Sequence, residues 1–262
     1  TIGAILGPAL AAGLLAWGLS RGRVELPWLR SLLWASLVPG LLAALVFALA
    51  VPEKPKSKPR LFAFRDAMKA MPPAFRRYLG GVGLFGCGDF AHTLLILAAA
   101  QLLAPALGPA RAAAWGVGLY VLHNAVYAAA AFPAGALADR FKAHRRLLGL
   151  GYLAGAAMPL MLASAFLHGH ASPLLMALVF SLGGLVNGIQ DTLEGATTAE
   201  LAPPEHRGLA FGLLGAVNGA GDLVSSLGVG LLWTWHPASA FFAAAALMAM
   251  GGLATLGLRS EA

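Results

Sequence analysis

Residues 173–199 read PLLMALVFSLGGLVNGIQDTLEGATTA, a run that is apolar enough to cross a membrane yet carries Asn187, Asp191, Glu194 and Thr198. These four residues step by four, three and four positions, which places them on one face of a helix. An ionisable group in hydrocarbon costs about 2.5–3.5 kcal/mol on insertion scales, so it persists where it faces a protected interior or water. The stretch therefore predicts a membrane helix whose polar stripe faces the inside of a helical bundle.

The rest of the chain has the same apolar character. Of its 262 residues, 59% are hydrophobic and only 11% are charged, too few for the surface of a soluble domain of this size. Runs of about 18 or more mostly apolar residues are candidates for membrane spans. We therefore predict an all-α integral membrane protein with eight spans, at 2–19, 31–51, 78–103, 112–138, 147–167, 173–199, 208–235 and 238–258.

The formal charge of +7 is distributed unevenly along the chain. If the spans alternate in direction, fourteen of the 18 Lys and Arg residues fall on one side of the membrane. Basic loops stay in the cytoplasm, so both ends of the chain are expected there. The charge is thus a topology signal, and no nucleic-acid partner is expected. The chain starts at Thr1 directly in apolar sequence, from which we expect a missing N-terminal portion.

The one long polar break, 52–77, is rich in proline and basic residues and divides two spans from six. We expect residues 1–51 to be two helices of one bundle, 52–77 to be a basic cytoplasmic linker, and 78–262 to be a six-helix bundle. Apolar residues recur near helical spacing late in the linker. This pattern is typical of a short amphipathic helix on the inner membrane face, and a solvated linker is the alternative.

Acids, amides and histidines occur at membrane depth in four spans, whereas 31–51, 147–167 and 238–258 contain none. Asp89 and His92 are three residues apart and are expected on one helix face. The candidate residues for binding substrate or a proton are Asp89, His92, His123, Asn124, Tyr127, Asn187, Asn218 and Asp222. The structural alternative is a set of hydrogen bonds between helices.

Other kinds of chemistry find less support in the sequence. His92, His123 and Asp89 would form a metal site only if the spans 78–103 and 112–138 brought them together, and we expect no metal and no cofactor. No Gly-rich phosphate loop, G-x-S-x-G or C-x-x-C is present, which argues against a soluble enzyme. A membrane-embedded enzyme that uses Asp191 and Glu194 as an acid–base pair is the alternative from another class.

Gly135-Ala136-Leu137-Ala138-Asp139-Arg140, followed by Arg145-Arg146, resembles the cytoplasmic loop signature of the major facilitator superfamily of secondary transporters. Residues 141–144 depart from that signature, because they lack its usual glycine and place the arginine pair later. Gly3-x-x-x-Gly7-Pro8 is similar to the fifth-helix motif of the proton-coupled exporters in this family. Residues 200–233 look like the region of the tenth and eleventh helices of bacterial members.

The resemblance implies that the chain supplies helices five to twelve of twelve, with the spans 31–51, 147–167 and 238–258 as outer supports. Substrate would bind near the membrane midplane between two six-helix bundles that expose it alternately to either side. Asp139, Arg140, Arg145 and Arg146 would act in the cytoplasmic gate. Near the same end, Asp191 and Glu194 are expected to pair with a cationic substrate or with a basic residue in the missing helices.

From these features we expect a secondary active transporter in a bacterial inner membrane, monomeric when full-length, with a small-molecule substrate. The resemblance of Gly7-Pro8 to the exporter motif, together with acids without a cavity arginine, favours proton-coupled efflux of a drug-like or cationic solute, and uptake of a nutrient or an organic acid is the alternative. Asp89 and Asp222 would bind substrate or carry the proton, because burial favours a neutral carboxyl group. The 262 residues alone are not expected to transport.

Overall fold

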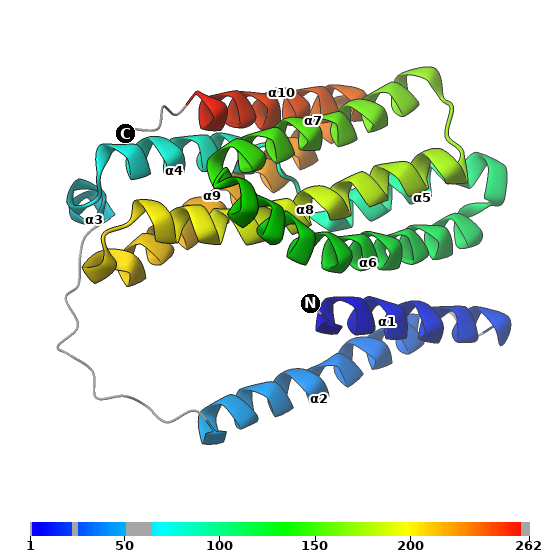
Figure 1. Cartoon of the computed structure of the whole chain (residues 1–262). Coiled ribbons are helices and arrows are strands. Elements are labelled where there is room, and N and C mark those ends of the chain that lie inside the picture. The colour runs from blue at the N-terminus through cyan, green and yellow to red at the C-terminus, as the bar shows by residue number, and fades with distance from the viewer. Residues whose placement is uncertain (1, 23–25, 51–63, 258–262) are drawn as a thin grey trace.

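The computed structural model describes residues 2–22, 26–50 and 64–257, and within these ranges the elements are helices (Figure 1). Their order is α1 Ile2–Ser20, α2 Leu26–Ala50, α3 Phe64–Ala70, α4 Pro73–Gly86, α5 His92–Leu107, α6 Pro109–Phe141, α7 His144–His168, α8 Pro173–Leu201, a 3-10 turn Pro204–His206, α9 Arg207–Trp235 and α10 Pro237–Leu256. The all-α expectation is confirmed for this part of the chain.

Six of the described helices are long and apolar enough to cross a membrane, namely α2 and α6 to α10. The prediction of eight spans is not confirmed, because two of the predicted spans give shorter apolar helices. In α1 the apolar part covers only Leu6–Gly18. The predicted span at 78–103 forms two helices, α4 and α5, instead of one.

Residues 87–91 interrupt this third span at membrane depth, between the end of α4 at Gly86 and the start of α5 at His92. Gly88 packs so closely on α10 that a Cβ atom there would lie 2.4 Å from the carbonyl oxygen of Ala244. Buried in protein, such non-helical backbone is tolerated where neighbours satisfy its polar groups. Here Ser225 Oγ on α9 donates to the carbonyl oxygen of Asp89 at 2.7 Å. The expectation that Asp89 and His92 share a helix face is therefore wrong.

Glycines bring the backbones of several helices into direct contact, as small residues do in membrane bundles. A Cβ atom at Gly184 on α8 would lie 2.2 Å from the carbonyl oxygen of His123 on α6. A Cβ atom at Gly251 on α10 would lie 2.4 Å from the main-chain nitrogen of Phe85 on α4. A Cβ atom at Gly221 on α9 would likewise meet the backbone of Gly86 on α4. These contacts fix the spacing of α4, α6, α8, α9 and α10.

The buried apolar side chains form two clusters that divide the bundle along its length. One cluster includes Leu95, Leu162 and Phe180, and the other includes Phe75, Leu148 and Leu193. In α6 to α10, the residues of one cluster give way to those of the other near the middle of the helix. Predicted polar residues lie between the two clusters and form what we call the polar layer: Asp89, His92, His123, Asn187 and Asp222.

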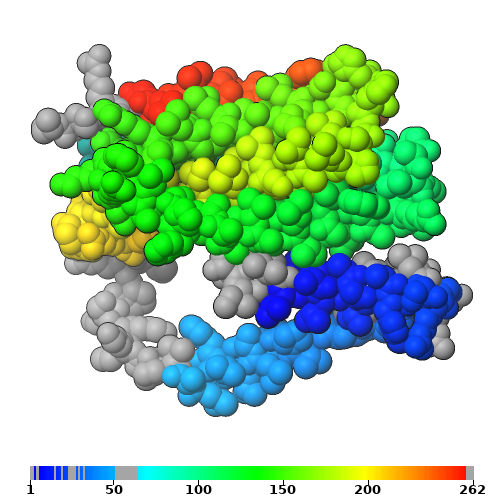
Figure 2. Space-filling view, turned by 45° about the vertical axis from the view of Figure 1, so that its right-hand side comes forward, coloured from blue at the N-terminus to red at the C-terminus, as the bar shows by residue number. Residues whose placement is uncertain are grey.

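The helices expected as outer supports are not uniformly peripheral. In α7, 50% of the membrane-span window is buried, and in α10 the figure is 44%, the two highest among the six candidate spans. In α2, by contrast, none of that window is buried. Figures 1 and 2 show α1 beside the main body of the bundle and α2 farther from it. The assignment of residues 1–51 to a second bundle stays a prediction.

The basic linker is only partly within the described residues, since 51–63 lie outside them. The short helix expected there is present as α3, and its Ala67 is buried in the second apolar cluster. Phe64, Arg65 and Lys69 are exposed on its other faces. One side of this short helix thus packs on the bundle, and its placement on the inner membrane face stays a prediction.

Replacement of Gly251 by Ala should destabilise the protein, because the added methyl group meets the backbone of Phe85. Overpacking of this kind costs about 1–3 kcal/mol. Gly80 on α4 is the matched control, since a Cβ atom there meets open space. Gly80→Ala should leave stability unchanged or raise it by up to about 1 kcal/mol. Thermal unfolding of the detergent-purified protein measures both, and equal Tm values for the two variants would contradict the packing argument.

Candidate functional site: a polar layer between two apolar clusters

Two histidines and an asparagine from three helices meet at the centre of the polar layer. Asn187 Nδ2 on α8 lies 2.9 Å from His92 Nε2 at the start of α5 and 3.5 Å from His123 Nε2 on α6. The two imidazole rings meet edge to face with 4.7 Å between their centroids. Tyr120, one turn before His123, stacks on that ring at 5.7 Å. The sequence predicted these three polar residues as cavity lining, and the structure brings them together.

The hydrogen bonds of this centre are consistent with neutral imidazoles. An amide nitrogen donates only, so each Nε2 that faces Asn187 acts as the acceptor. His123 Nδ1 then carries the hydrogen, which it donates to the carbonyl oxygen of Phe180 at 3.2 Å. His123 is 2% exposed, so this satisfied ring is part of the bundle interior.

Asp89 and Asp222 lie next to this centre, on neighbouring elements. Asp89 is half-buried in the helix break, and its carboxyl group lies beside the Gln190 amide of α8. Asp222 on α9 is exposed, and it is close enough to interact electrostatically with both Asp89 and His92. A small, partly enclosed pocket of about 10 Å³, room for about one water molecule, is lined by Asp89, Asn187 and Met158 among others. The two acids therefore share one region instead of lying on opposite flanks.

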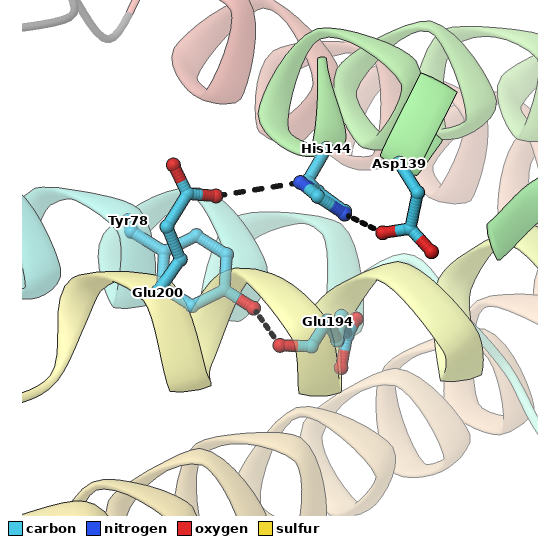
Figure 3. Close-up of polar contacts among 5 residues, drawn as sticks. All are labelled: Tyr78, Asp139, His144, Glu194 and Glu200. Atoms are coloured by element: carbon cyan, nitrogen blue, oxygen red, sulfur yellow. Dashed lines mark hydrogen bonds and ion pairs between the residues drawn. The ribbon is translucent and has the colours of Figure 1, made fainter. Parts of the chain in front are cut away.

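Glu194 lies deeper in the bundle, and side chains of two other helices donate to its carboxylate. Glu194 is only 3% exposed. The Tyr152 hydroxyl of α7 donates to Oε1, and Asn218 Nδ2 of α9 donates to Oε2 at 2.7 Å. The Tyr78 hydroxyl of α4 donates to the main-chain oxygen of Glu194 at 3.0 Å, as Figure 3 shows. Each carboxylate oxygen thus accepts a hydrogen bond from another helix, and the expected pairing of Glu194 with a cation stays a prediction.

Asp191, one turn earlier on α8, has a different environment. It is exposed, and its Oδ2 accepts a hydrogen bond of 2.8 Å from the Tyr127 hydroxyl on α6. Asp191 and Glu194 therefore have separate partners, although they are three residues apart. This arrangement gives no support to the acid–base pair of a membrane-embedded enzyme.

The residues expected in a cytoplasmic gate lie at the basic end of the bundle. Asp139 Oδ1 is 2.9 Å from His144 Nε2, and His144 Nδ1 is 3.5 Å from Glu200 Oε2 (Figure 3). Asp139, Arg140 and Arg146 are exposed, and Arg145 is half-buried. The closest described partner of Asp139 is thus a histidine in the segment that departs from the family signature. A role for these residues in gating stays a prediction.

Sequence reasoning missed some partners and misplaced others. Tyr152 lies in the span at 147–167, which has no acid, amide or histidine, and tyrosine hydroxyls were not counted as polar there. His144 is not among the sequence-predicted site residues, although its spacing of five from Asp139 could have indicated a contact across the turn. Asn124 was expected in the cavity lining, but it is buried and donates to the carbonyl oxygen of Tyr120 in its own helix at 2.8 Å. Among the described residues, no group of three His, Cys, Asp or Glu side chains has a geometry that suits a metal ion.

Comparison with known proteins agrees with this architecture. The sequence model of the Major Facilitator Superfamily matches residues 82–261. An uncharacterized MFS-type transporter of Methanocaldococcus jannaschii is 26% identical over 206 residues, which cover 79% of this chain and 50% of that protein. The chain thus spans about half the length of the curated relative that it matches. The family match covers most of the chain, and it agrees with the helical membrane architecture and with the motif at 135–146. The chain belongs to the major facilitator superfamily.

Proposed function

We propose that this chain is part of a secondary active transporter that works by alternating access. The observation that carries the proposal is the polar layer, in which Asp89, His92 and Asp222 lie together at a helix break between two apolar clusters. Polar and broken-helix elements at membrane depth are typical of substrate and ion sites in transporters. A small molecule would bind at this layer, between the described bundle and the helices of the other bundle.

The charge of the layer favours a cationic substrate. Asp191 and Asp222 are exposed acids, and the sequence from 78 to 107 and from 112 to 139 contains no lysine or arginine. The segments 173–206 and 208–236 contain none either. An organic cation near these carboxylates gains attraction that a low-dielectric site strengthens. A drug-like or cationic solute is therefore our proposed substrate class.

Proton-coupled efflux is the proposed mode. A carboxyl group can hold either a proton or a cationic group, so proton and substrate would compete at Asp89 and Asp222. Protonation of these carboxyl groups from the outside would release the substrate there. The bundles would then reorient, and the proton would leave on the cytoplasmic side. The protein would act as a monomer in a bacterial inner membrane, with both ends of this chain in the cytoplasm.

Uptake of an organic acid is the second candidate of the same fold. It would require a lysine or arginine in the site, and the described spans offer none beside the polar layer. Such a residue would have to come from helices of the other bundle. Competition by cations and by anions therefore separates the two substrate classes.

Replacement of Asp89 or Asp222 by Asn should reduce proton-driven transport in proteoliposomes about tenfold or more, since it removes an exchangeable proton while keeping similar size. Asp66→Asn on α3 is the matched control, because this exposed acid lies outside the layer. It should transport at the wild-type rate. Measurements at several pH values should show a weaker pH dependence for the two layer variants alone. Wild-type rates in both would remove these carboxyl groups from the mechanism.

Binding of a lipophilic cation such as tetraphenylphosphonium to the full-length protein should weaken as pH falls, because protons compete for the carboxylates. Asp191→Asn should also weaken it, since one exposed acid is neutralised. Tetraphenylborate, an anion of the same shape, serves as the control and should bind less tightly than the cation. Equal binding of both ions in a filter or equilibrium dialysis assay would argue for apolar partitioning and against a cation site.

A further inference from the structure

A groove of about 670 Å³ opens between α7 and α8, toward the end of the bundle that lies opposite α3 in Figure 1. Its wall is mostly apolar and consists of Ala157, Leu160, Met161, Ser164 and Ala165 on α7 and Leu175 on α8. His168 and His170 complete the lining at the end of α7. We propose that this groove binds one phospholipid that has a primary-ammonium headgroup. The site lies apart from the polar layer, so the inference goes beyond the proposed transport function.

The length of the groove matches one leaflet of a bilayer. From Ala157 to His168, α7 rises about 16 Å, at about 1.5 Å per residue. The hydrocarbon core of a bilayer is about 30 Å thick, so one leaflet provides about 15 Å. Ala157 lies near the middle of α7, and His168 is the last residue of this helix. An acyl chain therefore fits along the groove, with its headgroup beside the two histidines.

The groove opens on the side of α8 that is turned away from the acids. Leu175 and Asp191 are 16 residues apart on α8, which places them about 160° apart around the helix axis. Asp191 is exposed on the side where the helices of the other bundle are expected. Leu160 and Ser164 of the groove are exposed on α7. The groove therefore faces lipid, and its occupant has to be a molecule of the bilayer.

The two histidines place hydrogen-bond acceptors at the end of the groove. His168 Nδ1 lies 2.9 Å from the carbonyl oxygen of Ser164, and His170 Nδ1 lies 2.7 Å from the carbonyl oxygen of His168. A carbonyl oxygen only accepts, so each Nδ1 carries the hydrogen and each Nε2 of a neutral ring is an acceptor. Both side chains are exposed, and neither Nε2 has a hydrogen-bond partner in the described part of the chain.

These acceptors favour a headgroup that donates hydrogen bonds. The primary ammonium group of phosphatidylethanolamine has N–H donors, whereas the trimethylammonium group of phosphatidylcholine has none. Residues 147–190 contain no Asp, Glu, Lys or Arg, so no fully charged side chain of this segment competes with the histidines for the headgroup. Charge-assisted hydrogen bonds are stronger than neutral ones, which favours the ammonium group over a headgroup hydroxyl.

The test uses two photoreactive phospholipids that differ only in the headgroup, ethanolamine or choline, each with a diazirine in the middle of one acyl chain. Each lipid is added at the same low mole fraction to phosphatidylcholine vesicles that hold the full-length protein, at pH 8, where an ordinary imidazole is neutral. Peptide mass spectrometry then locates the adducts. Both lipids should label the groove residues of α7, and the ethanolamine lipid should do so about fivefold more, the factor that one hydrogen bond typically provides.

His168→Phe combined with His170→Phe should bring the two lipids to equal adduct yields in the groove, because a phenyl ring keeps the bulk and has no acceptor. His236→Phe is the matched control, since His236 is an exposed histidine at the same end of the bundle and outside the groove. It should keep the preference of the wild type for the ethanolamine lipid.

Ala157→Phe should lower the adduct yields of both lipids several-fold, because the larger side chain fills the groove. Ser164→Phe fills it from the exposed side of α7 and provides a second variant if Ala157→Phe does not fold. Ala154→Phe is the control, since Ala154 is exposed on α7 and does not line the groove. It should leave both yields unchanged, and thermal unfolding of each variant checks that it is folded.

Equal groove labelling by the two lipids in the wild type would overturn the proposal, as would a preference that persists in the double histidine variant. Absence of groove adducts from either lipid would show that another segment or a second copy of the chain covers the groove, and would overturn it too. The readout needs no substrate. A failure of cation transport would therefore leave this proposal intact, and the two can fail separately.

Discussion

Backbone polar groups at membrane depth need hydrogen-bond partners within the protein or in a water-filled cavity, and this requirement shapes the middle of the bundle. The clearest case is the backbone at 87–91, which leaves the helix where lipid offers no hydrogen bonds. The bond from Ser225 to the Asp89 carbonyl oxygen and the close approach of Gly88 to α10 keep this segment inside protein. The same break moves Asp89 out of a helix face and toward α8 and α9. One interruption of regular structure thus places the residue on which the proposed function depends.

The acids in and beside the polar layer fall into two kinds according to their partners. Asp191 and Asp222 are exposed, so each keeps an oxygen that a solute can approach. Glu194 has both oxygens bound by side chains from other helices. A buried carboxylate in such a network depends on its donors for compensation, because water does not reach it. Acids a short distance apart in this bundle therefore differ in what can contact them.

Much of this arrangement was accessible from the sequence, and the failures have identifiable causes. The stripe on 173–199 predicted that Asn187 and Asp191 face partners in a bundle, and the loop at Gly135–Arg146 predicted the family. The different fates of Asp191 and Glu194 depend on which helices flank α8, and one sequence does not contain that information. Hydropathy also could not show the break at 87–91, because Ala244 and Ser225, which make it tolerable, are more than 100 residues away. Tyr152 was missed because a span without charges was read as uniformly inert.

The contact between Gly184 and the His123 carbonyl oxygen has a mechanical consequence. Where two backbones touch without side chains between them, the helices cannot slide along each other in small steps. The next position that repeats the same side of a helix is one turn away, a displacement of about 5.4 Å. Each intermediate offset would drive a larger side chain into the opposing main chain. The register of α6 against α8 is therefore fixed. In any rearrangement of the bundle, we expect these two helices to move together as one rigid unit.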